Sequence, residues 1–173
     1  MEPPRVPALL LTGTVGAGKS TIGGEISDTL AELEIPNAFV DLDELIWQWP
    51  STSRWNNDLM FLNLASLWPN YAAHGATHLI LARVLEDLDD LSRYRLAVPG
   101  ADITICRLVA DETERLRRLH TRMQPGPLRD WHLARTVELH DILERAALEN
   151  FVVANDRTVR EVALEVLNLA GWI

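Results

Sequence analysis

Several residue types are scarce in this chain, and each shortage argues against a class of protein. The 173 residues include one cysteine, Cys106, so an intramolecular disulfide is excluded and a reducing compartment is favoured. No apolar run approaches the ~20 residues that a membrane-spanning helix needs. The first residues lack the apolar core of a signal peptide, so we expect a cytoplasmic protein without a membrane partner.

Positive charge is also in short supply. The chain has 16 basic residues against 25 acidic ones, which gives a net charge of −9. Nonspecific binding to nucleic acid needs a basic surface, so we expect no nucleic-acid partner. Length and an apolar content of 47% predict one globular domain over residues 1–173, with a flexible proline-rich lead at residues 1–7. A monomer and a homodimer both stay open.

Lysine is almost absent, because 15 of the 16 basic residues are arginine and Lys19 is the only lysine. Lys19 is the lysine of a glycine-rich stretch that fits the P-loop pattern Gly-x4-Gly-Lys-Ser. The stretch is Gly13-Thr14-Val15-Gly16-Ala17-Gly18-Lys19-Ser20, followed by Thr21. An apolar run at 8–12 precedes it and a helical apolar spacing follows, which is the setting that a P-loop needs. A chance glycine-rich turn before a helix is the alternative.

The residue types of this stretch suit a nucleoside triphosphate with Mg2+. Glycines let backbone N–H groups come close to phosphate oxygens. Lys19 supplies a compact charge for the β- and γ-phosphates, and unit charges about 4 Å apart attract by roughly 4 kcal/mol at an effective dielectric of ~20. Ser20 supplies a hydroxyl for the metal. We therefore predict that residues 13–21 bind ATP and Mg2+.

Apolar runs alternate with amphipathic stretches along the rest of the chain. Strands are expected at 8–12, 38–41, 78–82, 103–108 and 151–153, with helices between and after them. This β-α order predicts a single three-layer α/β/α domain around a five-stranded parallel sheet.

Two aspartates, Asp41 and Asp43, follow the second expected strand. Ligands of open α/β sheets bind outside the carboxyl ends of the strands, so these carboxylates are expected near the phosphates. Alternation along an extended chain places both on one side. One of them could hold Mg2+ through water and the other could orient or deprotonate a substrate hydroxyl. The alternative is that Asp43 caps the next helix.

Aromatic residues gather just after these aspartates. Trp47, Trp49 and Trp55 lie close to Arg54, and this density predicts the wall of a substrate pocket, with ordinary packing as the alternative. Asn56, Asn63 and Asn70 form a polar stripe on the next expected helix. This stripe is expected either to line the substrate site or to face solvent.

The third expected strand ends without an acidic residue. Arg83 stands there instead, and it is expected either to bind an anionic group of the substrate or to pair with Glu86 or Asp87.

A later helix carries Arg115, Arg118 and Arg122 on one face and leads into a segment that contains Arg129. This pattern predicts a lid at about 122–130 that brings positive charge onto a transferring phosphoryl group, where one arginine is worth ~10³ or more in rate. The alternative is a solvated face paired with nearby glutamates.

With the P-loop, Asp-Leu-Asp after the second strand, the arginine helix and Asn155-Asp156-Arg157 after the fifth strand, the chain resembles the small P-loop kinases. It is similar to the adenylylsulfate, shikimate and gluconate kinases, and most of all to actinobacterial adenylylsulfate-kinase-like proteins. The resemblance implies the P-loop NTPase fold with strand order 2-3-1-4-5. It also implies that Asp41 and Asp43 serve Mg2+ and the acceptor, and we take Asp41 as the metal ligand and Asp43 as the residue at the acceptor. It further implies that Arg118 lies against adenine, that Arg122 or Arg129 reaches the phosphates, and that residues 155–157 border adenine.

The chain departs from the patterns of these kinases near the acceptor. Residues 41–44 read Asp-Leu-Asp-Glu where adenylylsulfate kinases usually have Asp-Gly-Asp-Asn. The glycine motif with which shikimate kinases bind their acceptor after the third strand is absent as well. The resemblance therefore points to ATP as the donor and leaves the acceptor unidentified.

The expected activity is transfer of the γ-phosphoryl group of ATP to the hydroxyl of a small-molecule acceptor. The catalytic residues would be Lys19, Asp41, Asp43, Arg122 and Arg129. The alternative is a nucleotide-binding regulatory or complex subunit without transfer activity, which the missing acid after the third strand favours. A GTPase is disfavoured, because guanine recognition usually needs Asn-Lys-x-Asp and residues 154–157 contain no lysine.

Overall fold

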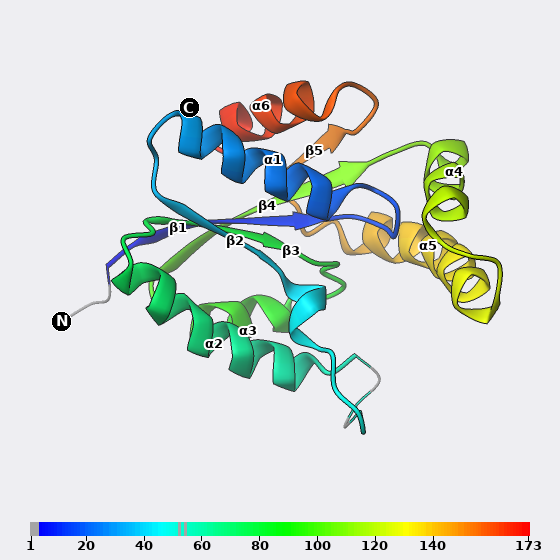
Figure 1. Ribbon diagram of the computed structural model, residues 1–173, viewed down its shortest axis with the longest axis horizontal. Helices are drawn as coiled ribbons and strands as arrows, with labels where there is room; N and C mark the ends of the chain where they lie inside the picture. The colour runs from blue at the N-terminus through cyan, green and yellow to red at the C-terminus, as the bar shows by residue number, and fades with distance from the viewer. Residues whose placement is uncertain (1–3, 52, 54) are drawn as a thin grey trace.

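A five-stranded sheet organises the molecule. The computed structural model describes residues 4–51, 53 and 55–173. The strands are β1 (Val6–Thr12), β2 (Asn37–Asp41), β3 (His78–Ala82), β4 (Ala101–Val109) and β5 (Phe151–Ala154). They pair in parallel in the order β2-β3-β1-β4-β5, as predicted. With helices on both faces, this is the expected α/β/α fold with the strand order of P-loop kinases (Figure 1).

Central strand β1 is almost continuously apolar because both of its faces are buried. Ala8 and Leu10 belong to one core, and Leu9 and Leu11 belong to the other. The strand begins at Val6, two residues earlier than expected, where Val6 and Pro7 stand opposite Ala101 and Asp102 of β4. The prediction of a flexible lead is therefore wrong for Val6 and Pro7.

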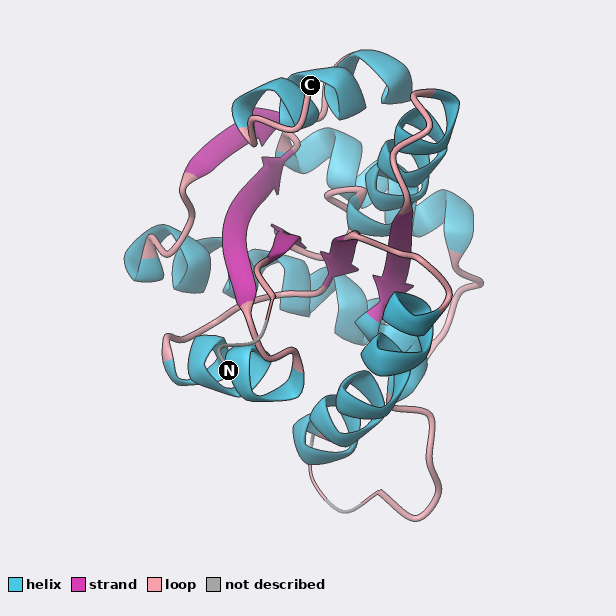
Figure 2. Ribbon diagram, turned by 90° about the vertical axis from the view of Figure 1, so that its left-hand side faces the viewer, coloured by secondary structure: helices cyan, strands magenta, loops and turns pink. Residues whose placement is uncertain are grey.

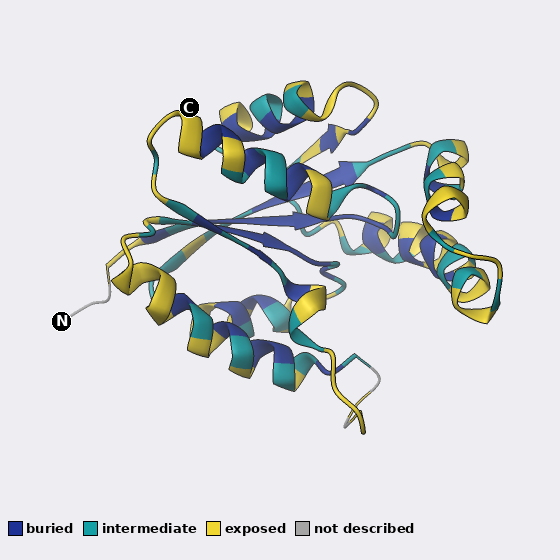
Figure 3. Cartoon of the chain, viewed as in Figure 1, coloured by how far each residue is buried: buried dark blue, intermediate teal, exposed yellow. Residues whose placement is uncertain are grey.

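Two pairs of helices form the outer layers. Helices α1 (Lys19–Glu32) and α6 (Val159–Leu169) lie together on one face of the sheet, and α2 (Asn57–Ala73) and α3 (Asp89–Ala97) lie on the other (Figures 1 and 2). Each pair turns its apolar side inward, so buried residues concentrate between the layers (Figure 3). Helix α3 begins at Asp89, and before it the backbone N–H of Leu85 donates to Oγ1 of Thr12 at 2.9 Å.

The remaining helices, α4 (Glu112–Arg122) and α5 (Pro127–Ala146), lie beyond the carboxyl ends of the strands (Figure 1). Helix α5 begins at Pro127, and proline is well suited to this first position because it lacks an N–H that would stay unpaired there. The predicted lid at about 122–130 is therefore a short join, residues 123–126, between two helices. Movement of this join stays a prediction.

The single cysteine lies in the core. Cys106 of β4 is fully buried, and burial raises the pKa of its thiol to about 12, with a further increase from the Glu165 carboxylate. A thiol with this pKa is protonated at neutral pH, so it is a poor nucleophile. Within the described part of the chain, none of the helices combines the length and the apolar character needed to cross a membrane.

Two adjacent glycines of α1 give a matched test of the packing between α1 and β2. A methyl group at Gly23 would lie 2.4 Å from Cε2 of Phe39, whereas one at Gly24 would meet nothing within 4 Å. Because alanine is a better helix former than glycine, Gly24→Ala should raise the free energy of unfolding by about 0.5–1 kcal/mol. Gly23→Ala should lower it, because Phe39 must move. Urea unfolding followed by tryptophan fluorescence measures both, and equal effects would contradict this contact.

Candidate functional site

The P-loop connects β1 to α1 and uses glycine where a side chain would not fit. Gly13, Gly16 and Gly18 have φ angles of 144°, 83° and 97°. A methyl group at Gly13 would lie 2.5 Å from the carbonyl oxygen of Leu108, and one at Gly18 would lie 2.3 Å from Nδ2 of Asn155. Both the backbone conformation and the neighbours therefore require glycine at these two positions.

Three consecutive carbonyl oxygens of the P-loop accept hydrogen bonds from side chains of other segments. The pairs are Val15 with Thr136 Oγ1 (2.7 Å), Gly16 with Arg118 Nη1 (3.3 Å) and Ala17 with Asn155 Nδ2 (2.8 Å). The donors belong to α5, to α4 and to the segment after β5. Because these carbonyls are engaged with protein donors, the loop can offer its amides and the N-terminus of α1 to an anion.

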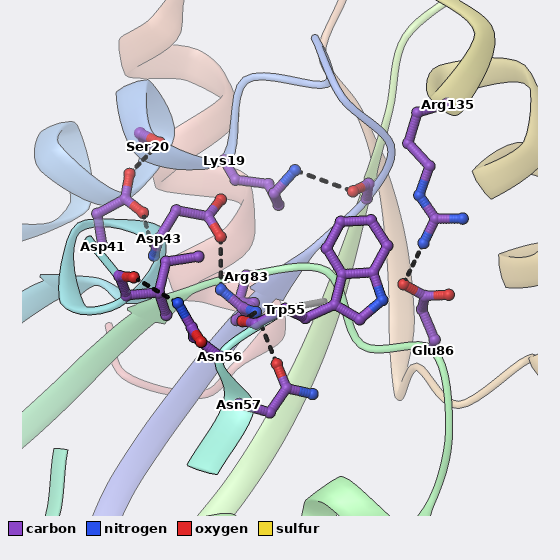
Figure 4. Close-up of polar contacts among 12 residues, drawn as sticks. Lys19, Ser20, Asp41, Asp43, Trp55, Asn56, Asn57, Arg83, Glu86 and Arg135 are labelled. Atoms are coloured by element: carbon purple, nitrogen blue, oxygen red, sulfur yellow. Dashed lines mark hydrogen bonds and ion pairs between the residues drawn. The ribbon is translucent and has the colours of Figure 1, made fainter. Parts of the chain in front are cut away.

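The Lys19 ammonium lies within the loop that precedes it. Its Nζ donates to the carbonyl oxygens of Gly13 (2.9 Å) and Thr14 (3.0 Å) (Figure 4). Burial lowers the pKa of Lys19 to about 8, although the carboxylates of Asp43 and Asp41 act in the opposite direction. A bound polyphosphate would favour the charged form of this amine.

Ser20 and Asp41 meet at the start of α1. The Ser20 hydroxyl donates to one carboxylate oxygen of Asp41, and the other oxygen accepts from the backbone N–H of Asp43 at 3.1 Å (Figure 4). Asp41 thereby caps the short 3₁₀ helix η1 (Leu42–Leu45), so the capping role considered for Asp43 falls to Asp41.

A hydroxyl and a carboxylate at one point are hard oxygen ligands that suit Mg2+. In the part of the chain that the structure describes, no cluster of three or more histidine, cysteine or acidic side chains could hold a metal. A magnesium ion beside Ser20 and Asp41 would therefore depend on phosphate oxygens and water for most of its ligands.

Arg83 is buried at the end of β3 and is occupied by protein partners. Its Nη1 donates to Oδ1 of Asp43 at 2.6 Å, and its Nη2 donates to Oδ1 of Asn57 at 2.8 Å (Figure 4). The expected pairing with Glu86 or Asp87 is therefore wrong. The Asp43 side chain is 59% exposed, so Arg83 fixes a carboxylate that remains accessible.

Two adjoining cavities lie at this edge of the sheet. One, of about 350 Å³, is formed by the P-loop and α4, and the other, of about 830 Å³, lies between η1, the segment after β3 and α5. We call them the P-loop cavity and the large cavity. The residues that line both are Val15, Ser20, Asp43, Val84, Arg122 and His132. A ligand in one cavity would therefore meet a ligand in the other beside these shared side chains.

The predicted aromatic wall is present in part. Trp47 lines the large cavity and is 82% exposed, whereas Trp49 is 91% exposed and lines neither cavity. Trp55 also lines the large cavity, where its ring lies 5.8 Å from that of Trp131. Arg54 lies outside the described residues. The polar stripe along α2 is not a continuous solvated face or a continuous wall of the substrate site. Asn56 and Asn63 donate to the carbonyl oxygens of Ile46 (3.0 Å) and Leu45 (2.8 Å), so these two side chains hold the residues after η1 against α2.

Some of the residues expected at the nucleotide are brought to the P-loop. Arg118 contacts Gly16 and donates to the carbonyl oxygen of Asn155 at 3.1 Å. It also donates to Glu114 at 2.7 Å, and hydrogen bonds from this arginine and from Arg117 lower the pKa of Glu114 to about 2.

The other expected residues divide between the cavities and the surface. Arg122 lines both cavities, and Arg129 lines neither. Asp156 and Arg157 line neither cavity and pair with each other at 3.3 Å. Arg122 therefore lies at the P-loop cavity, whereas roles for Arg129, Asp156 and Arg157 at the nucleotide stay predictions.

One face of α5 supplies cavity residues that the sequence analysis missed. Trp131, His132, Arg135 and Leu139 all line the large cavity. Burial lowers the pKa of His132, Arg122 lowers it further and Asp43 opposes both effects. Their spacing places them on one side of a helix, and this spacing is the signal from which the sequence could have identified them.

The geometry agrees with comparisons to known proteins at the level of the fold. The sequence matches no protein-family model and no curated protein. Among solved structures, a gluconokinase from Sinorhizobium meliloti 1021 is 17% identical, with a TM-score of 0.66 over 98% of this chain and 94% of that one. An APS kinase from Mycobacterium tuberculosis, in complex with AMPPNP and APS, is 19% identical, with a TM-score of 0.62 over 98% of this chain and 99% of that one. A shikimate kinase from Bacteroides thetaiotaomicron is 17% identical, with a TM-score of 0.64 over 95% of this chain and 98% of that one. The predicted small P-loop kinase fold is confirmed.

Lys19 should couple nucleotide binding to proton uptake. With a pKa of about 8, the amine is largely neutral at pH 9 in the free protein, and a bound triphosphate restores its charge. Affinity for AMPPNP with Mg2+ should therefore fall as pH rises above 8, by up to about tenfold per pH unit. Calorimetry at pH 9 in two buffers with different ionisation enthalpies should show proton uptake that is absent at pH 7. Equal heats in the two buffers at pH 9 would contradict the lowered pKa.

Proposed function

We propose that the protein is an ATP-dependent phosphotransferase that moves the γ-phosphoryl group to a hydroxyl of a small-molecule acceptor. The observation that carries this proposal is that the P-loop cavity and the large cavity share Asp43, Arg122 and His132. A donor phosphate held by the P-loop and an acceptor in the large cavity would meet at these side chains, which is the proximity that transfer requires.

The P-loop side of the site would stabilise the phosphates. Lys19, the loop amides and Arg122 would place positive charge where negative charge develops during transfer. Ser20 and Asp41 would hold Mg2+, which when bound neutralises charge on the phosphate oxygens. Arg118 and Asn155, which lie against the outer side of the loop, would border the nucleotide base.

Asp43 would act on the acceptor. Its Oδ1 is fixed by Arg83 at 2.6 Å, which leaves Oδ2 free to accept a hydrogen bond from an acceptor hydroxyl. As the hydroxyl oxygen bonds to the γ-phosphorus, the bond from that phosphorus to the β–γ bridging oxygen breaks and ADP leaves with the electron pair. The hydroxyl proton passes to the Asp43 carboxylate. Arg83 is a positioning residue in this scheme.

The arrangement also accounts for the missing acid after β3. Arg83 occupies that place, and the neighbouring strand β2 supplies Asp41, which reaches Ser20. A carboxylate therefore stands beside the P-loop hydroxyl although β3 does not provide it. This favours transfer over a nucleotide-binding subunit without activity. Fold neighbours that are gluconate, APS and shikimate kinases add support for phosphotransfer to a small molecule.

Product formation tests the proposal directly. The protein, ATP and Mg2+ would be incubated with a panel of sugars, amino alcohols, nucleosides and hydroxy acids, and mass spectrometry would detect a phosphorylated acceptor alongside ADP. Lys19→Ala should abolish turnover, because the γ-phosphate loses its ammonium partner. Turnover that survives this substitution would refute the mechanism, and tight ATP binding without any product would select the nucleotide-binding alternative.

Asp43→Asn should separate chemistry from nucleotide binding. Loss of the base should lower kcat by about 10²-fold or more, since general bases contribute 10²–10⁴. Affinity for AMPPNP, measured by calorimetry, should change little. The matched control is Asp28→Asn, an exposed aspartate of α1 that lines neither cavity and should leave kcat unchanged. Equal kcat values for the two variants would remove Asp43 from the reaction.

A further inference from the structure

The large cavity has an excess of negative charge. Three arginines line it, together with six acidic residues: Asp41, Asp43, Glu44, Glu86, Asp87 and Asp90. A negatively charged cavity is poorly suited to an anionic ligand, because the cavity carboxylates would repel the ligand strongly at a partly buried site.

The arginines of the cavity do not offset this excess where an acceptor would lie. Arg83 is engaged by Asp43, and Arg135 is engaged by Glu86 (2.5 Å) and Glu138 (2.7 Å). Arg122 lines the P-loop cavity as well, so its charge is shared between the two cavities.

Three carboxylates face the remainder of the large cavity, those of Glu44, Asp87 and Asp90. Arg93 approaches Asp90 at 3.6 Å but does not line the cavity, and it also donates to Asp58. Burial raises the pKa of Asp90 and the Asp87 carboxylate raises it further, while Arg93 and Arg83 act in the opposite direction. A cation placed among these groups would relieve that repulsion.

Aromatic rings form the rest of the wall. The indoles of Trp47, Trp55 and Trp131 line the same cavity, and the Trp47 ring is largely uncovered by protein. Indole faces attract organic cations and stack on the apolar faces of ring compounds, and the Arg135 guanidinium already lies 5.0 Å from the centre of the Trp55 ring. Carboxylates alone would suit a metal ion, whereas carboxylates beside indoles suit an organic ammonium group.

From this combination we infer that the acceptor is a hydroxyl-bearing organic cation, such as an amino sugar or an aromatic amino alcohol. The inference rests on the proposed function, because it names the class of acceptor for that site. The ammonium group lies among Glu44, Asp87 and Asp90, the apolar part lies against the indoles, and the hydroxyl reaches Asp43. The expectation that Arg83 binds an anionic substrate group is replaced by its role as the partner of Asp43.

Two ligand series that differ mainly in charge test the inference. One consists of glucosamine, glucose and gluconate, and the other of phenylalaninol, 3-phenylpropanol and phenyllactate. Binding to the protein saturated with AMPPNP and Mg2+ would be measured by calorimetry and by tryptophan fluorescence. We expect the cation to bind most tightly and the anion most weakly, with Kd values about tenfold or more apart in at least one series. Tightest binding by an anion, equal binding of the three charge types, or no binding by either cation would overturn the inference.

Three aspartates at and just before the start of α3 supply the variants and their control. Asp87→Asn combined with Asp90→Asn should weaken binding of the cation about tenfold and leave the neutral ligand unchanged. The fold should persist, because asparagine can replace Asp87 as acceptor for the backbone N–H of residue 90, which lies at 3.2 Å. The control is Asp89→Asn, an exposed residue that lines neither cavity. An equal loss with the control, or no loss with the double variant, would contradict the inference.

Failure of the inference can be told apart from failure of the proposed function. Ligand binding is read with AMPPNP, so it does not depend on turnover, and it can be repeated without nucleotide. If the cation binds as expected but ATP yields no phosphorylated product, phosphotransfer fails and the charge preference stands. If gluconate or phenyllactate is the compound phosphorylated, phosphotransfer stands and the inference is overturned.

Discussion

The shape of the P-loop depends on hydrogen bonds from residues that lie more than a hundred positions away in the chain. Thr136, Arg118 and Asn155 each hold one of three consecutive carbonyls. A buried carbonyl that loses its donor costs about 1–3 kcal/mol, so the loop is stable in this form only when α4, α5 and the segment after β5 are in place. The conformation of the P-loop thus depends on tertiary contacts, although the P-loop pattern itself is a run of neighbouring residues.

Helix α5 unites the two cavities. Thr136 holds the P-loop, while Trp131, His132 and Arg135 of the same helix line the large cavity. A shift of α5 would therefore move side chains at the P-loop and in the large cavity together. This arrangement links occupancy of the large cavity to the geometry of the P-loop without any further element.

The parts that could be predicted from the sequence are those set by neighbouring residues. The glycine spacing around Lys19, the apolar strands and the position of Asp41 and Asp43 at a strand end are local signals, and they gave the fold, the P-loop and the acidic pair. The parts that could not be predicted depend on distant contacts. Whether Arg83 meets Glu86 or Asp43 is decided by how β3 lies beside β2, and no spacing in the sequence contains that information.

The same limit explains the residues that were misplaced. Trp49 and Trp55 share one short aromatic segment, yet only Trp55 is turned into the large cavity, where it meets Trp131 of α5. Arg122 and Arg129 both flank the join between α4 and α5, and the early start of α5 at Pro127 places Arg129 on a different helix from Arg122. The composition of the sequence indicated which segments lie near the cavities. Which side chains of those segments line a cavity depends on where each helix begins and ends.

The solitary lysine gives the protein an unusual chemical simplicity. The other 15 of its 16 lysine and arginine residues are arginines, so the side-chain amine of the protein is a single nitrogen inside the P-loop. Burial keeps that nitrogen closer to its neutral, nucleophilic form than an ordinary lysine, so an acylating or aldehyde reagent has one side-chain amine to modify, and this amine lies in the P-loop pocket. The covalent labelling pattern of the intact chain is therefore a direct report on whether that pocket is filled.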